Sequence, residues 1–205
     1  KKIAANLELE FASTVVLAGA GDPLLNPDII GIIEFMNRSY PSLNVSITTN
    51  GIALTRKMSE ALLKHNISSI NVSINSATKE TFKRIMQVDA FAQVCRNVRT
   101  FTDLKNSRGS GPNLQLSSAI NRLNIEELPD LVELARTVGA VSVNLMYCRF
   151  YPERIRHLNV KREKDRLLNK DSLYFHQELS DNMILKAKNI AVRYGIAMSH
   201  EPLFQ

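Results

Sequence analysis

The feature that most constrains the fold is a repeated change of period, from short apolar runs to helix-like patterns. The apolar run Thr14–Ala18 predicts a buried parallel strand. Pro27 then opens a predicted helix with Asn26 as its N-cap. Further strands are predicted over 45–49, 67–75, 114–120 and 141–146, with helices over 55–64, from 78, over 89–104 and over 125–138. This alternation predicts a parallel sheet with right-handed crossovers.

The number of these units sets the expected fold class, which is α/β. A helix from about Ser172 to Tyr194 and a strand over Ile196–Ser199 add a sixth unit to the five before them. A complete eight-stranded barrel typically needs about 250 residues. The 205 residues therefore suit an open or partial barrel, with a doubly wound sheet as the alternative.

Composition excludes several classes of protein. Hydrophobic residues make up 44% and charged residues 22% of the chain, which is typical of globular proteins and not of disordered or coiled-coil ones. No apolar run reaches the roughly 20 residues of a membrane span, and the chain opens without a signal peptide. Two cysteines, Cys95 and Cys148, exclude a disulfide scaffold. We therefore expect a cytoplasmic protein without a membrane partner.

Charge is concentrated late in the chain. The net charge of +6 is compatible with an anionic substrate or with nucleic acid and selects neither. Residues 149–170 hold eight basic and three acidic side chains. We predict a basic linker over 149–171, with binding of RNA or an acidic peptide as the alternative.

Ligands of parallel α/β folds bind at the carboxyl ends of the strands, so the residues there are the candidate site. The first end carries Gly19-Ala20-Gly21-Asp22-Pro23 and the second Thr48-Thr49-Asn50-Gly51. The later ends carry small and amide side chains: Ser73, Asn75, Ser118, Asn121, Asn144, Met146 and Tyr147. The first turn is not a dinucleotide fingerprint, because position 24 is Leu, and no Gly-Lys-Ser/Thr follows it. The four histidines offer no convincing place for a Ser–His–Asp triad.

The order of three strand ends is more specific than any one of them. The turn from Gly19 to Pro27, the Thr49-Asn50-Gly51 turn and the Ser73-Ile74-Asn75 end together resemble the radical S-adenosylmethionine (SAM) superfamily over residues 14–147. The resemblance implies a partial (β/α)6 barrel whose first strand bears a Cys-x3-Cys-x2-Cys loop. Those thiolates would hold a [4Fe–4S] cluster that binds SAM and reduces it to methionine and a 5′-deoxyadenosyl radical, which abstracts a substrate hydrogen.

The sequence departs from the family pattern in two places. The cysteine motif is absent, since Cys95 and Cys148 are 53 positions apart, so we expect the first strand and the cluster loop to precede Lys1–Phe11, the end of the first helix. In addition, Asp22 stands where the family usually has Glu, which keeps the charge and shortens the reach by one methylene.

The resemblance implies roles for individual residues. Gly21 and Asp22 would bind the SAM ammonium, with Gly19 and Ala20 shaping the turn. Arg84 would hold the SAM carboxylate, or else be an exposed helix arginine. The remaining candidates are Ser73 and Asn75 for the ribose or carboxylate, Ser118 and Asn121 for the methionine or ribose, and Asn144, Met146 and Tyr147 for the adenine.

These roles predict the core of a radical SAM enzyme, an oxidoreductase or transferase, that modifies a peptide, a cofactor or other small molecule, or a nucleic acid. No catalytic residue is assigned. The core would span 1–148, and 172–205 would hold its last helix and strand, leading to a C-terminal domain in many relatives. An electron donor such as flavodoxin or ferredoxin is implied. The alternatives are a non-catalytic module that binds SAM or a partner on a degenerate scaffold, and a metal-free barrel lyase.

Overall fold

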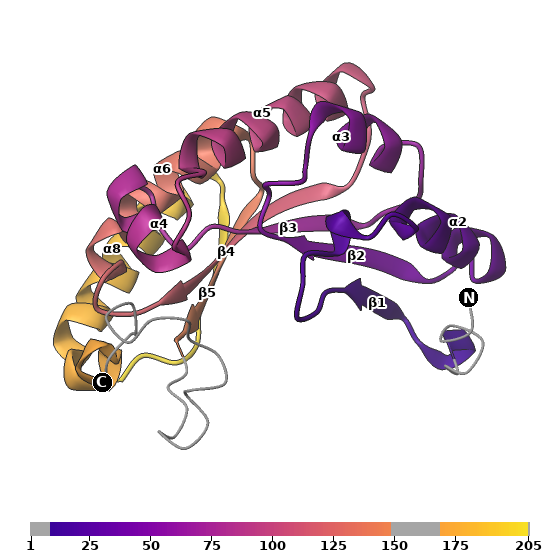
Figure 1. Cartoon of the computed structure of the whole chain (residues 1–205). Helices are drawn as coiled ribbons and strands as arrows, with labels where there is room; N and C mark the ends of the chain where they lie inside the picture. The colour runs from indigo at the N-terminus through magenta and orange to yellow at the C-terminus, as the bar shows by residue number, and fades with distance from the viewer. Residues whose placement is uncertain (1–8, 149–168, 205) are drawn as a thin grey trace. The chain divides into compact units, whose positions relative to one another are not determined.

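The computed structural model describes residues 9–148 and 169–204. It has one six-stranded sheet with the strands in chain order, β1 to β6 (Figure 1). The strands are β1 (Thr14–Leu17), β2 (Asn44–Thr49), β3 (Ser69–Ser73), β4 (Asn113–Ile120), β5 (Ser142–Tyr147) and β6 (Ala197–Ser199). Strand β1 pairs with β2, β2 with β3 and β5 with β6, each in parallel orientation. The predicted α/β class, in the form of a partial barrel, is confirmed.

Helices connect successive strands, as the alternating pattern predicts. They are α2 (Ile29–Ser39), α3 (Arg56–Leu62), α4 (Lys79–Met86), α5 (Phe91–Ser107), α6 (Leu128–Val138) and α8 (Gln177–Tyr194). Short 3₁₀ turns lie at Leu9–Phe11, Pro23–Leu25, Ile125–Glu127, Asn169–Asp171 and Leu173–Phe175. Thr55 and Thr78 are N-caps whose side chains accept from backbone N–H groups in the first turn.

Three predicted boundaries are wrong in detail. Asn26 is not the N-cap of α2, because its side chain accepts from the N–H of Asp28, and Asp28 holds the cap position. The helix predicted over 125–138 begins with a 3₁₀ turn and becomes α-helical at Leu128. The helix predicted from Ser172 is also preceded by a 3₁₀ turn, which Ser172 caps, and α8 begins only at Gln177. Each difference arises from a hydrogen bond or a 3₁₀ turn at the start of a helix, and the spacing of apolar residues does not predict either.

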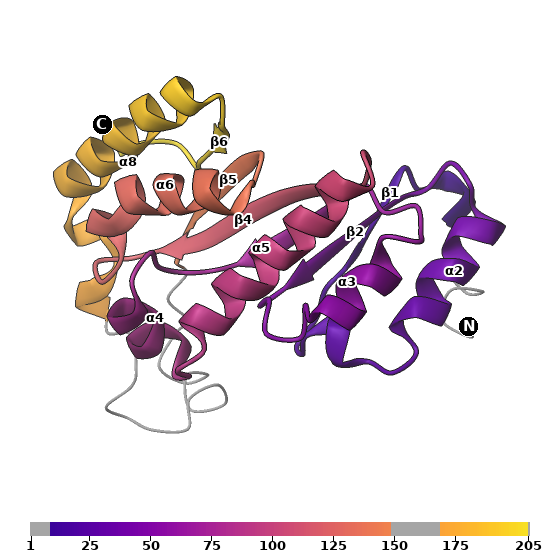
Figure 2. The ribbon, with the colours of Figure 1, turned by 90° about the horizontal axis from the view of Figure 1, so that it is seen from above.

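The chain divides into two compact units, of which the first holds residues up to Ser73 together with Ala92–Gln115. Its core lies between the sheet and helices α2, α3 and α5, which cover one face of β1, β2 and β3 (Figure 2). Alternate strand residues supply that core: Val45, Ile47, Ile70 and Val72 are all at most 1% exposed. The alternation places every second side chain on the opposite face.

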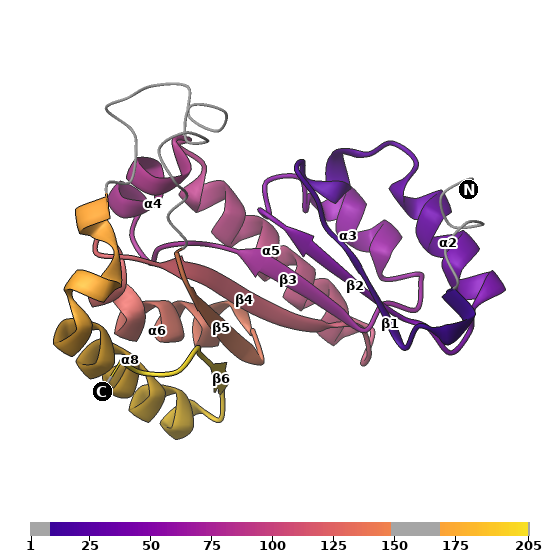
Figure 3. The ribbon, with the colours of Figure 1, turned by 90° about the horizontal axis from the view of Figure 1, so that it is seen from below.

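The opposite face of β2 and β3 is polar. Figure 3 shows it without any helix of the described residues in front of it. Ser46 pairs with Ser69 and Thr48 with Asn71 in the parallel register, and the hydroxyl oxygens of Ser46 and Ser69 are 2.9 Å apart. The amide oxygen Oδ1 of Asn71 is buried and has no hydrogen-bond partner among the described residues.

The second unit holds Ile74–Phe91 and the chain from Leu116 onward. Its core gathers α4, α6 and α8, with Phe82, Ile125 and Ile184 fully buried. The rings of Phe82 and Phe91 pack with centroids 5.6 Å apart. Helices α6 and α8 lie side by side in both views (Figures 1 and 2). The basic linker predicted at 149–171 falls largely outside the described residues. Within residues 9–148 and 169–204, no helix is long and apolar enough to cross a bilayer.

Candidate functional site

The turn after β1 is fastened to the turn after β2 by the carboxylate of Asp22. Its Oδ1 accepts the N–H of Leu24 at 2.9 Å, which caps the 3₁₀ turn Pro23–Leu25. Its Oδ2 accepts the hydroxyl of Thr49 at 2.8 Å and the N–H of Asn50 at 2.7 Å. Thr49 is 2% exposed, whereas Asp22 and Asn50 are half-buried, so these bonds are partly shielded from solvent. The sequence placed Asp22 at a strand end but did not show these partners.

The glycines before Asp22 leave open space at the end of β1. Gly19, Ala20 and Gly21 are all exposed. A Cβ added to Gly19 or to Gly21 would meet no atom within 4 Å. The backbone of this turn is therefore accessible to a ligand, as the Gly-Ala-Gly sequence predicts.

The turn after β2, in contrast, is closely packed. Gly51 has φ +79°, and an added Cβ would lie 2.9 Å from Cγ1 of Val94 and 3.1 Å from Cγ1 of Val72. The side-chain amide of Asn97 donates to the carbonyl of Gly51 at 3.0 Å. The N–H of Gly51 in turn donates to the hydroxyl of Thr49. Only glycine fits this position. The Asn50-Gly51 pair therefore serves the close packing against Val72 and Val94 as well as the turn.

In the second unit, the predicted residue Asn75 is bonded within the protein. Its Oδ1 accepts the N–H of Ala119 at 2.8 Å, and its Nδ2 lies 3.3 Å from the sulfur of Met86. Its backbone carbonyl accepts from the side-chain amide of Asn124 at 2.9 Å. Asn75 thus ties the segment after β3 to the end of β4.

Asn121 is buried, with 1% of its surface exposed, and it also shapes a turn. Its Oδ1 accepts the N–H of Leu123, and its own N–H donates to Oδ1 of Asn124. The hydroxyl of Ser118 differs from these amides, because it is buried and has no hydrogen-bond partner among the described residues. Ser73, in the first unit, ends β3 half-buried, and Arg84 is exposed on α4.

Glu127 is a residue that the sequence reasoning missed. Its carboxylate accepts the N–H groups of Ala77 and Thr78 at 2.8 and 3.2 Å, and the hydroxyl of Thr78 at 2.8 Å. These donors precede α4, so an acidic group occupies the positive end of that helix. The separation of about 50 residues in sequence hides this contact from any local pattern.

The end of β5 is engaged by the C-terminal segment. The N–H of Tyr147 donates to Glu201 at 2.9 Å, and its ring packs on Phe204. Asn144 Oδ1 accepts from the hydroxyl of Ser199, whereas Met146 is 54% exposed. Burial raises the pKa of the Tyr147 hydroxyl and that of the Cys148 thiol. Of the three predicted adenine contacts, Met146 has the most open side chain.

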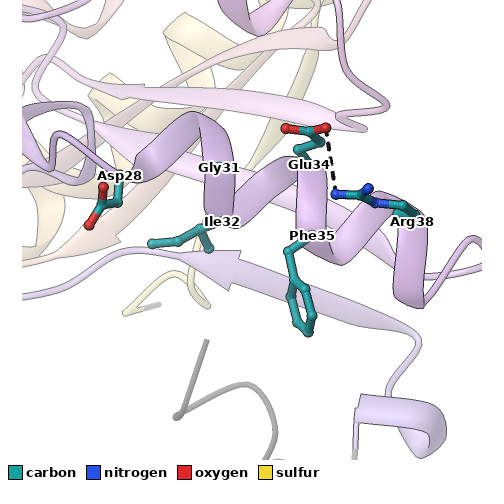
Figure 4. Close-up of a pocket in the computed structure, with 6 residues that line it drawn as sticks. All are labelled: Asp28, Gly31, Ile32, Glu34, Phe35 and Arg38. Atoms are coloured by element: carbon teal, nitrogen blue, oxygen red, sulfur yellow. Dashed lines mark ion pairs between the residues drawn. The ribbon is translucent and has the colours of Figure 1, made fainter.

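One hollow of about 430 Å³ lies elsewhere, along α2 (Figure 4). Ile32 and Phe35 supply its apolar lining, and Glu34 and Arg38 form an ion pair at 3.6 Å. Asp28 and Gly31 complete the lining, and none of the predicted site residues takes part.

The residues present fit SAM and an iron–sulfur cluster to different degrees. The turn at Gly19–Gly21 is exposed, and a Cβ at either glycine would meet no protein atom, so a ligand can approach its backbone closely. A cluster bound by three thiolates does not fit, because the sequence contains only Cys95 and Cys148. Among the described residues, no three His, Cys, Asp or Glu side chains are grouped to hold a metal.

Solved structures with the same fold share little sequence with this chain. Streptococcus suis SuiB bound to S-adenosylmethionine aligns with a TM-score of 0.65 and 14% identity, over 92% of this chain and 39% of that one. His-tagged anSMEcpe with bound AdoMet aligns with a TM-score of 0.63 and 12% identity, over 91% and 49%. At these identities the likeness shows the fold alone.

Curated relatives are closer in sequence. A probable GTP 3′,8-cyclase of Saccharolobus islandicus is 32% identical over 145 residues, which cover 71% of this chain and 44% of the relative. A protein of the same name from Saccharolobus solfataricus is 27% identical over 193 residues, which cover 94% of this chain and 58% of that protein. The chain thus spans about half the length of these relatives. Residues 1–135 match the Radical SAM superfamily, whose members use SAM and a [4Fe–4S] cluster, and the chain belongs to that superfamily.

Proposed function

We propose that these residues form the SAM-binding part of a radical SAM enzyme, which cleaves SAM reductively and uses the radical to abstract a hydrogen from its substrate. The open Gly19–Gly21 turn carries the proposal. It lies at the carboxyl end of β1, within the range that matches the superfamily. Its exposed backbone supports a role in binding the methionyl end of SAM.

The chemistry of the turn suits an ammonium group. An ammonium needs hydrogen-bond acceptors, and the backbone carbonyl groups of a turn with glycine at two of its three positions can supply them at close range. Asp22 adds a negative charge directly behind the turn. The predicted roles of the residues in the second unit, among them Ser118 and Arg84, stay predictions.

The [4Fe–4S] cluster that the family uses would supply the electron, and we propose that its cysteine ligands belong to a part of the protein outside these 205 residues. Two cysteines do not suffice for three iron ligands. An electron donor such as flavodoxin or ferredoxin is part of the same proposal.

The substrate is proposed to be a peptide, a small molecule or a nucleic acid, as the resemblance to the superfamily implies. The name of the curated relatives supports GTP as the first compound to test, since they are 27–32% identical to this chain. Solved structures of SuiB and anSMEcpe with a bound peptide are only 14–15% identical to this chain, so a peptide substrate has less support.

The test uses the full-length protein, purified without oxygen and reconstituted with iron and sulfide. With dithionite and SAM, we expect brown protein that releases 5′-deoxyadenosine and methionine in equal amounts, measured by liquid chromatography with mass detection. Colourless protein that leaves SAM intact would contradict the proposal. Protein that binds SAM without iron and without cleavage would instead support the alternative, a non-catalytic SAM-binding module.

A further inference from the structure

The carboxylate of Asp22 accepts hydrogen bonds from three groups of the protein itself. Four lone-pair positions are available on a carboxylate. The N–H groups of Leu24 and Asn50 occupy two of them, at 2.9 and 2.7 Å. The Thr49 hydroxyl lies 3.0 Å from Oδ1 and 2.8 Å from Oδ2, so it takes up space in front of both oxygens.

These partners come from two different turns. Leu24 belongs to the turn after β1, whereas Thr49 is the last residue of β2 and Asn50 follows it. Strands β1 and β2 are paired only up to Leu17 and Ile47, so the ladder between these two strands does not join the turns beyond them. The charge of Asp22 therefore supplies the connection that the sheet lacks at this place.

We propose that Asp22 is a positioning residue, which fastens the Gly19–Gly21 turn to the end of β2 so that the backbone of the turn faces the SAM ammonium. This inference rests on the proposed function for the identity of the ligand. It differs from the role that the resemblance implies, in which the carboxylate itself binds the ammonium. The fastening itself is a property of the unliganded protein and is tested separately.

The first experiment measures amide hydrogen exchange in the unliganded full-length protein. Replacing Asp22 by Asn removes the charge from the bonds to Leu24 and Asn50. Such bonds are each worth about 1.5–3 kcal/mol, so exchange at these amides should rise about ten- to hundredfold. Asp28→Asn is the matched control, because Asp28 is exposed and its carboxylate caps no backbone group. Unchanged exchange in Asp22→Asn would overturn the inference.

The second experiment separates positioning from direct binding by calorimetric titration of SAM. Thr49→Val keeps the Asp22 charge and removes one of its donors, whereas Thr49→Ser keeps the hydroxyl. If Asp22 positions the turn, Thr49→Val should weaken SAM binding severalfold, whereas Thr49→Ser should bind SAM as the wild type does. The double variant Asp22→Asn/Thr49→Val should lose less affinity than the product of the losses of the two single variants, because both act on the same set of bonds.

Direct binding gives a different pattern. Asp22→Asn would then weaken SAM binding while Thr49→Val matched the wild type, and that pattern would overturn the inference. If no form of the protein binds SAM, the proposed function fails, and the exchange rates at Leu24 and Asn50 still decide whether Asp22 fastens the turn.

Discussion

Replacing Gly51 by Ala should destabilise the first unit through two separate effects. The residue has φ +79°, in the left-handed region, which costs an L-residue about 1–2 kcal/mol. The new Cβ would also lie 2.9 Å from Cγ1 of Val94 and 3.1 Å from Cγ1 of Val72, both of which are buried side chains. Overpacking of this kind costs about 1–3 kcal/mol. The sum is a loss of about 2–5 kcal/mol in the free energy of unfolding.

Gly109 is the matched control for the backbone effect. Its φ is +73°, and an added Cβ would meet nothing within 4 Å. Gly109→Ala should therefore lose only the conformational part, about 1–2 kcal/mol. Urea unfolding followed by circular dichroism measures both losses, and the slope with denaturant should stay the same for all variants.

A second substitution tests the proposed clash directly. Val94→Ala removes the methyl group nearest to the new Cβ, so it should destabilise the Gly51→Ala variant less than the wild type, by a coupling of about 0.5–3 kcal/mol. The reasoning would be refuted if Gly51→Ala lost no more stability than Gly109→Ala, or if the two effects of Gly51→Ala and Val94→Ala simply added.

Three further outcomes can be checked. Gly21→Ala should change the free energy of unfolding by less than about 1 kcal/mol, since its Cβ meets no protein atom. It should nevertheless weaken SAM binding at least tenfold, because the added methyl group would stand between the ligand and the backbone of the turn. Gly31→Ala, at an equally open position on α2, is the control, and equal SAM affinities of the two variants in calorimetry would argue against SAM binding at the Gly19–Gly21 turn. Glu127→Gln should lower the free energy of unfolding in urea by about 1.5–3 kcal/mol, because its carboxylate accepts hydrogen bonds from the residues before α4. Glu126→Gln should lower it by only about 0–1 kcal/mol, since the ion pair of Glu126 with Arg122 is exposed. The reverse order would show that the bonds of Glu127 do not stabilise the start of α4. Because burial raises the pKa of Cys148, iodoacetamide should alkylate it at pH 8 more slowly in the folded than in the unfolded protein, with a rate that still climbs above pH 9; a rate that levels off near pH 8 would show the opposite shift.

The fold could be predicted because each of its signals is local. The apolar run before Gly19 and the caps at Thr55 and Thr78 each depend on residues a few positions apart, and all three appear in the structure. Helix starts were less predictable: Asn26 and Ser172 are good capping residues that bond to the turn before the helix instead.

The candidate site could be predicted only as a set of positions, because its bonds join residues far apart in sequence. Thr49 is 27 positions from Asp22, and Glu127 is 49 from Thr78. A sequence shows that Asp22 follows a strand, and the strand-end rule then suggests a ligand. It does not show which donors the carboxylate meets, so an acidic side chain that binds a ligand and one that binds the protein look alike.

The short side chain of Asp22 is consistent with fastening. An Asp can accept from a backbone N–H two residues further on, as Asp22 does with Leu24, and this bond fixes the carboxylate close to its own turn. From there it reaches the end of β2, where Thr49 and Asn50 donate to it. A Glu at this position would hold its carboxylate one methylene further from its own backbone, which does not suit the short bond to the N–H of Leu24. The replacement of the family's usual Glu by Asp thus favours a carboxylate that shapes the backbone around the ligand.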